Sequence, residues 1–339
     1  MSVEDLILHF EYDENREKQF YIPGETIRGT ILLHLRMGLR VRSMSLLILG
    51  GAAVSWEVQG KVKMYSAREE YLQGSKLLLD SGVEDSLLMD RGVHEFTFQY
   101  LLPTNLPSSF AGVYGSVTYV AKVVLEPEDG SATTITSEPF MVLRRPPLPP
   151  HTFSDWEMKK SKSLFGLCTT GQIKLYCRIS RTAAIPGEVI YVNAEVSNWS
   201  PRGITLIQAA VIMESTYHAR NTDSKNNKIV FRQILNKRWR NVQLAVPPYL
   251  ADSGLEECSI IDVKYLFEFR VQIEGRDDLV VQTPLYVGGH PIGYMNESAR
   301  GYRRMDLDGF SLANNELPWY GGGMGTMSET VDGDFFDLR

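Results

Sequence analysis

The first 145 residues show a two-residue alternation of apolar and polar side chains. Apolar residues occupy every second position in five segments, which cover residues 6–12, 27–35, 44–58, 94–100 and 117–123. Because successive side chains of a strand point to opposite faces, each segment is predicted to be a half-buried strand. Gly50-Gly51 interrupts the third segment, which predicts a bulge or bend there. The region from Glu69 to Leu79 has the best helical period and is predicted to be a short helix or a mobile loop.

The same alternation restarts in residues 173–177, 192–196 and 261–271. Antiparallel strands with one apolar face pair those faces, usually as two packed sheets, so the fold class is all-β with two sandwiches. Between them lies Arg144-Arg145-Pro146-Pro147-Leu148-Pro149-Pro150. Proline has no amide donor and restricts the residue before it, which predicts an extended linker.

Two short sequences recur in the same order in both halves. Ile22-Pro23-Gly24-Glu25 is matched by Ile185-Pro186-Gly187-Glu188, and Val117-Thr118-Tyr119 by Val263-Lys264-Tyr265. Both Pro-Gly pairs are expected to form turns that open strands, and the shared order favours a duplication. The predicted organisation is an N-terminal sandwich at 1–145, a Pro-rich linker at 146–160 and a C-terminal sandwich at 161–290. Residues 291–339, rich in Gly, Asn, Asp and Ser, are expected to form a flexible tail.

Length and charge agree with two protein-binding domains. The chain has 339 residues, of which 43% are hydrophobic, and 35 basic against 41 acidic residues give a net charge of −6. No overall positive field attracts nucleic acid, so nucleic acid is not an expected partner. The start resembles no secretory signal and no apolar run reaches a membrane span, so we expect a cytoplasmic protein. Cys168, Cys177 and Cys258 form no disulfide or zinc pattern and are expected to be reduced.

No recognisable catalytic or cofactor motif is present. The sequence lacks a phosphate-binding Gly-Lys-Ser/Thr loop, a dinucleotide fingerprint, a His pair with a metal-binding spacing and a Gly-x-Ser-x-Gly elbow. We therefore expect a protein that is not an enzyme and holds no cofactor. One enzymatic alternative stays open, in which His94 acts with nearby carboxylates on a sandwich scaffold.

Several longer sequences resemble the arrestin-domain-containing proteins, the α-arrestins. The match includes Leu106-Pro107-Ser108-Ser109-Phe110, the run from Tyr114 to Tyr119, and the run from Cys258 to Tyr265. The resemblance implies two tandem arrestin-like, immunoglobulin-like β-sandwiches. It also implies a non-enzymatic adaptor that binds cytoplasmic segments of membrane receptors or transporters. Such adaptors link their cargo to WW-domain HECT-type ubiquitin ligases for endocytosis and protein transport, and reach the plasma membrane and endosomes peripherally, through the cargo.

A tail motif fits this role. Leu317-Pro318-Trp319-Tyr320 matches the Leu-Pro-x-Tyr variant of the PY motif with which family members recruit WW domains. An exposed proline favours the extended left-handed backbone that docks between aromatic rings, and the tyrosine adds a second anchor. The alternative is an aromatic pair that packs back onto a sandwich.

Three further stretches carry hypotheses of their own. Arg144, Pro147 and Pro150 have the Arg-x-x-Pro-x-x-Pro spacing of an SH3 ligand, although a stiff hinge explains the prolines equally well. Cys258 stands where a thioredoxin-interacting member of the family carries its redox-active cysteine, which implies a thioredoxin-binding regulator; simple burial is the alternative. Lys237-Arg238-Trp239-Arg240 suits acidic headgroups with the indole at the interface, or else a solvated strand edge.

Overall fold

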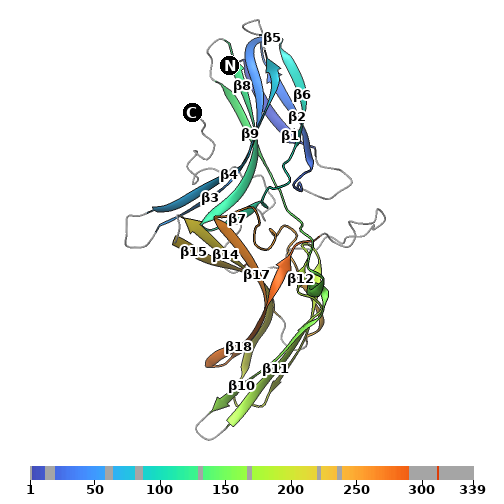
Figure 1. The fold of residues 1–339 in the computed structure, drawn as a ribbon, viewed down its shortest axis with the longest axis vertical. Coiled ribbons are helices and arrows are strands. Elements are labelled where there is room, and N and C mark those ends of the chain that lie inside the picture. Colours follow the sequence, from blue (N-terminus) through green and yellow to red (C-terminus); the bar gives the residue numbers. More distant parts are fainter. Residues whose placement is uncertain are drawn as a thin grey trace, which may run out of the picture. The chain divides into compact units, whose positions relative to one another are not determined.

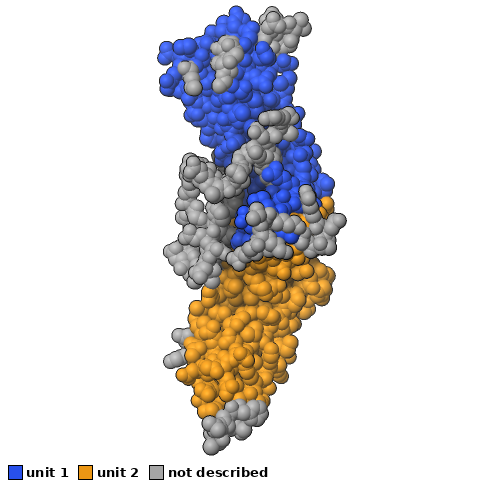
Figure 2. Space-filling model, turned by 90° about the vertical axis from the view of Figure 1, so that its left-hand side faces the viewer, with its two compact units in different colours: residues 1–143, 317–339 blue, residues 144–316 orange. Residues whose placement is uncertain are grey.

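Strands form nearly all the regular structure of the computed structural model, whose chain is drawn in Figure 1. It describes residues 2–11, 20–57, 64–80, 87–128, 133–165, 170–219, 223–234, 239–289 and 311–312. The chain divides into unit 1, which contains residues 1–143, and unit 2, which begins at Arg144 (Figure 2). The prediction of an all-β fold with two sandwiches is confirmed. Within the described residues no helix is long and apolar enough to cross a membrane.

Unit 1 contains two antiparallel sheets. The first has the order β1-β2-β6 and comprises β1 (Val3–Phe10), β2 (Thr26–Leu35) and β6 (Gly92–Leu101). The second has the path β4-β3-β8-β7, with β5 on β3 and β9 on β8. Its strands are β3 (Leu39–Glu57), β4 (Met64–Asp80), β5 (Leu87–Met89), β7 (Phe110–Gly112), β8 (Gly115–Pro127) and β9 (Thr134–Phe140).

The alternating positions form the core of unit 1, as predicted. In β2 every second residue from Ile27 to Leu35 is buried, and in β8 every second residue from Val117 to Pro127. Each apolar face is therefore removed from water by the opposite sheet, which supplies the main driving force for folding.

The predicted irregularity at Gly50-Gly51 is confirmed. Gly50 pairs with Leu72 and Gly51 with Glu70, so Tyr71 of β4 is the extra residue of a bulge. A Cβ atom at Gly50 would overlap the ring of Tyr119. Glycine thus leaves room for an aromatic ring of the neighbouring strand.

The helix or loop predicted for Glu69 to Leu79 is wrong, because these residues belong to β4. Every residue of this region except Tyr71 and Leu78 has a pairing partner on β3, for example Gln73 with Leu49 and Leu77 with Ser45. Backbone pairing with a long neighbouring strand outweighs the local helical period of a mostly polar segment.

Unit 2 also has two sheets. One has the order β10-β11-β13-β16 and contains β10 (Trp156–Phe165), β11 (Thr170–Ile179), β13 (Val189–Asn198) and β16 (Trp239–Ala245). The other has the order β12-β18-β17-β14-β15-β19, in which β12 runs parallel to β18. Its strands are β12 (Ala183–Ala184), β14 (Ile204–Ala219), β15 (Asp223–Ile234), β17 (Ile261–Ile273), β18 (Arg276–Val287) and β19 (Ser311–Leu312). A 3-10 helix, Pro150–Phe153, precedes β10, which begins inside the range expected for the linker.

The repeated Pro-Gly sequences form matching turns. The amide of Glu25 donates to the Ile22 carbonyl at 3.0 Å, and that of Glu188 to the Ile185 carbonyl at 3.1 Å. The glycines have φ values of 88° and 85°, a left-handed conformation that glycine adopts without strain. Proline followed by such a glycine is the sequence of a type II turn, and each turn opens a strand as predicted.

Candidate functional site

The two linker arginines contact the loop between β16 and β17. Arg144 lies 2.8 Å from Glu256, 3.5 Å from Glu257 and 3.9 Å from Asp252. The Asp252 side chain is fully buried, whereas that of Arg144 is 18% exposed. The Arg144 guanidinium therefore faces three carboxylates, and its positive charge compensates the negative charge of the buried Asp252.

Arg145 and Pro146 extend this attachment through backbone groups. Arg145 donates to the carbonyls of Leu250 at 3.1 Å and Pro248 at 3.4 Å, and the amide of Gly289 donates to the Pro146 carbonyl at 2.8 Å. The start of the linker thus packs along unit 2.

This placement bears on the SH3 hypothesis without testing it. Pro147 and Pro150 are exposed, as an SH3 ligand requires. Arg144, however, already meets acidic side chains of its own unit and would have to leave them to reach those of a partner. SH3 binding stays a prediction, with an ionic contact to break first.

Cys258 lies in the same loop, three residues before β17 begins. Its side chain is half-buried, and its amide donates to the Leu255 carbonyl at 3.1 Å. Leu255 and Glu257 have positive φ values of 47° and 73°, so this loop has a tightly specified backbone. The structure therefore brings together the regions of two predicted sites, Arg144 and Cys258.

Cys177 differs from Cys258 in its surroundings. It lies on the core face of β11 and is buried. Burial raises the pKa of its thiol to about 12, which keeps it protonated at neutral pH. Cys177 thus behaves as a small core residue, in agreement with the packing interpretation. Cys168 lies outside the described residues.

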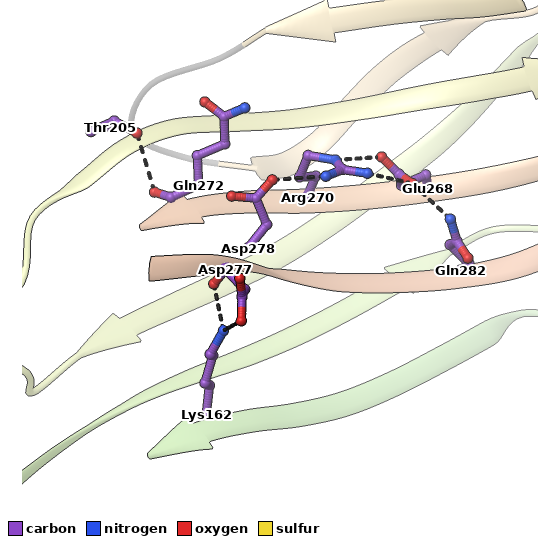
Figure 3. A network of polar contacts seen from close by, with 8 residues as sticks. All are labelled: Lys162, Thr205, Glu268, Arg270, Gln272, Asp277, Asp278 and Gln282. Carbon is purple, nitrogen blue, oxygen red and sulfur yellow. Dashed lines mark hydrogen bonds and ion pairs between the residues drawn. The ribbon is translucent and has the colours of Figure 1, made fainter. Parts of the chain in front are cut away.

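A polar network lies on the face of β17 and β18 that points away from the core (Figure 3). Arg270 contacts both carboxylate oxygens of Glu268, at 2.7 and 3.1 Å, and also Asp278 at 2.7 Å. Gln282 donates to Glu268 at 2.7 Å. The hydrogen bond with Glu268 raises the pKa of Arg270, and the Glu268 side chain is only 4% exposed.

Sequence reasoning missed this network. Its signal is Glu268-x-Arg270 in the polar positions of an otherwise apolar strand, a spacing that places both side chains on one face. Burial of Glu268 also requires Gln282 and Asp278 from β18, and only the β17-β18 register brings these residues together. All of its charged members are paired with one another, as buried charges require.

Two other predicted residues are placed by the structure. The Nε2 atom of His94 lies 2.8 Å from the backbone carbonyl of Asp90, so its contact is with the main chain. Among the described residues, no three His, Cys, Asp or Glu side chains are grouped to hold a metal ion. Of the two alternatives for residues 237–240, the one that places the Trp239 indole among headgroups is excluded, because this side chain is 2% exposed and its ring centroid lies 5.0 Å from that of Phe269. Residues 317–320, which form the tail motif, lie outside the described residues.

Both units match arrestin domains. The arrestin (or S-antigen) N-terminal domain matches residues 8–146, and the arrestin (or S-antigen) C-terminal domain matches residues 169–292. Together these two matches span most of the chain and follow its division into two sandwiches. The class of protein is therefore a tandem arrestin-domain protein.

Relatives narrow the assignment. The chain is 28% identical to arrestin domain-containing protein 4 of Mus musculus over 333 residues, which covers 90% of this chain and 78% of the relative. It is 27% identical to the Homo sapiens protein of the same name, and the match covers 90% of this chain and 77% of the relative. It is 25% identical to arrestin domain-containing protein 1 of Mus musculus, and the match covers 82% of this chain and 64% of the relative. The chain belongs to the α-arrestin family, the arrestin-domain-containing proteins. Membership of this family supports an arrestin-like adaptor role, and arrestin family proteins are typically non-enzymatic.

Proposed function

We propose that this protein is a trafficking adaptor whose sandwiches bind cytoplasmic segments of a membrane receptor or transporter. Its Leu317-Pro318-Trp319-Tyr320 motif then recruits a WW-domain HECT-type ubiquitin ligase, and the ubiquitinated cargo enters endocytosis and protein transport. The observation that carries the proposal is the match of both units to arrestin domains. The protein resides in the cytoplasm and reaches the plasma membrane and endosomes with its cargo.

The chemistry of the motif supports the ligase step. A proline in an extended left-handed backbone costs little ordering entropy when it docks between aromatic rings of a WW domain. Tyr320, two residues further on, supplies an aromatic ring and a hydroxyl for a second pocket. Leucine in the first position keeps an apolar contact where many motifs have proline.

Capture of the full chain by immobilised WW domains tests this step. We expect Tyr320→Ala to abolish capture and Tyr302→Ala, a tail tyrosine without a preceding Leu-Pro, to leave it unchanged. Equal capture of the Tyr320→Ala variant and the original protein would refute the ligase link. Proximity labelling in cells with the same pair reports cargo as well, and we expect the Tyr320→Ala variant to lose the ligase and keep the cargo.

The half-buried position of Cys258 favours a second candidate, thioredoxin binding. The Cys258 thiolate would attack the disulfide of oxidised thioredoxin, forming one mixed disulfide and releasing one thioredoxin thiolate. Thioredoxin without its second active-site cysteine, activated as a mixed disulfide with a small thiol, should then trap this protein by releasing that thiol. Trapping should be lost with Cys258→Ser and kept with Cys177→Ser. Trapping that persists in Cys258→Ser would exclude this candidate.

A further inference from the structure

The turn between β13 and β14 in unit 2 is held in one conformation by its own polar groups. The side-chain nitrogen of Asn198 donates to the Arg202 carbonyl at 2.7 Å, and its side-chain oxygen accepts from both the backbone amide and the hydroxyl of Ser200, at 2.9 and 2.7 Å. The amide of Trp199 donates to the Gln172 carbonyl at 2.9 Å. A Cβ atom at Gly171 would overlap the backbone of Ser200, so β11 supports the turn closely.

This turn presents a tryptophan to solvent. Trp199 is 62% exposed, whereas Trp56 and Trp239 are only 6% and 2% exposed. The ammonium group of Lys174 lies over its ring, 5.0 Å from the centroid. A large apolar side chain held in water by a rigid turn is a binding element, because little ordering entropy remains to be lost on binding.

Besides Lys174, further basic residues lie on the elements next to this turn. Arg202 belongs to the same turn. The turn between β17 and β18 lies next to it, because the amide of Glu274 donates to the Gly203 carbonyl at 3.0 Å, and Arg276 directly follows that second turn. Lys162 adds a charge from β10 and contacts Asp277. With Lys174, four basic residues face two acidic ones, Glu274 and Asp277, although the whole chain carries −6. Glu268 and Asp278, further along β17 and β18, are already paired with Arg270.

We infer that this end of unit 2, the Trp199 turn with Lys174, Arg202 and Arg276, docks directly on an anionic lipid bilayer. Tryptophan partitions to the headgroup region of membranes, and nearby lysine and arginine are attracted to anionic lipids. Among the described residues of this turn, the exposed apolar side chains are those of Trp199 and Pro201, whose area is far less than the roughly 800 Å² per partner of a typical protein interface. A bilayer needs no such area or pocket. The contact goes beyond the proposed function, in which cargo alone brings the protein to the membrane.

Vesicle binding by the full chain tests the inference without any cargo. We expect sedimentation with phosphatidylserine–phosphatidylcholine vesicles, weaker binding to phosphatidylcholine alone, and loss of binding as salt is raised toward about 1 M, where charges are screened within about 3 Å. Trp199→Ala should weaken binding about ten-fold, because the indole supplies most of the apolar area that leaves water when the turn enters the bilayer. Arg202→Glu should weaken it several-fold, and only on vesicles with phosphatidylserine. Phe153→Ala is the matched control, since Phe153 is also exposed, at 49%, but lies in the 3-10 helix.

Tryptophan fluorescence locates the contact. Brominated phospholipids should quench part of the emission, and Trp199→Phe should remove that part while keeping the fold, because the side chain is exposed. Absence of vesicle binding would overturn the inference. So would binding that Trp199→Ala leaves unchanged, or quenching that persists in Trp199→Phe. Loss of a protein partner in Trp199→Ala with intact vesicle binding would assign the turn to a protein contact instead, which also overturns it.

Discussion

The hydroxyl of Tyr119 donates a hydrogen bond to the Pro107 carbonyl at 2.7 Å, from a side chain that is 1% exposed. Unit 2 repeats the arrangement, because the hydroxyl of Tyr265 donates to the Ala251 carbonyl at 2.9 Å. Each tyrosine ends one copy of the repeated Val-x-Tyr sequence, and each ties a central strand to the segment that leads into it. The repeat in the sequence thus has a repeated structural role, as expected after a duplication.

Removing either hydroxyl should destabilise its own unit. We expect Tyr265→Phe to lower the free energy of unfolding by about 1–2 kcal/mol, because the ring stays while a buried carbonyl loses its donor. Tyr119→Phe should do the same in unit 1. Urea unfolding of the full chain measures the change, with Tyr286→Phe, at a 39% exposed tyrosine, as the control. Equal midpoints for Tyr265→Phe and the original protein would show that the bond contributes nothing.

Gly50→Ala should be among the more harmful small substitutions in unit 1. The new methyl group would overlap the Tyr119 ring, so the ring or the strand must move, at a cost of about 1–3 kcal/mol. Gly38→Ala is the matched control, because a Cβ atom there would meet only the Met89 carbonyl at 3.5 Å and Leu88 at 3.8 Å. Chemical denaturation should place Gly38→Ala within about 0.5 kcal/mol of the original protein. A similar loss in both variants would contradict the steric account.

Local patterns predicted much of the fold. The two-residue period of β2 and β8 reflects one buried face, and the Pro-Gly turns need only backbone preferences, so both are visible in the sequence. The prediction of a helix or loop for Glu69 to Leu79 is wrong because the strand conformation of β4 depends on its pairing with β3. The two strands are far apart in the sequence: Ser43 of β3 pairs with Asp80 of β4, 37 residues later. Such long-range pairing leaves little trace in a mostly polar segment.

The binding features depended still more on tertiary structure. Trp239 lies between two arginines in the sequence and Trp199 lies three residues before a third, yet Trp199 is exposed and Trp239 packs on Phe269. Trp199 is exposed because it follows the last residue of β13, whereas the burial of Trp239 depends on which face of β16 it occupies, and that is decided only when register and sheet face are known. The partners of Arg144, more than 100 residues away, could not be found from spacing at all.

The buried thiol of Cys177 should make unit 2 less stable at high pH. Its folded pKa of about 12 lies above the ordinary value of 9.0, so above pH 9 the unfolded state loses the proton while the folded state keeps it. Fewer protons bound in the unfolded state mean that stability falls as pH rises from about 9 to 12, by at most about 1.4 kcal/mol per unit. Other groups titrate there too, so the test compares Cys177→Ala with the original protein. The urea midpoint of Cys177→Ala should fall less steeply with rising pH than that of the original protein. Equal slopes would show that Cys177 does not contribute to the pH dependence.

The contact between Arg144 and Asp252 yields a prediction about the linker. Arg144→Met keeps much of the side-chain volume but removes the guanidinium beside a fully buried carboxylate, so unit 2 should lose about 2–3 kcal/mol of stability. Glu256→Gln should change stability by less than about 1 kcal/mol, because Glu256 is 61% exposed and solvent already screens its charge. Denaturant unfolding of the full chain, followed by circular dichroism, measures both changes. Equal effects of the two substitutions would show that Arg144 acts only through its exposed carboxylates and leaves Asp252 to other contacts.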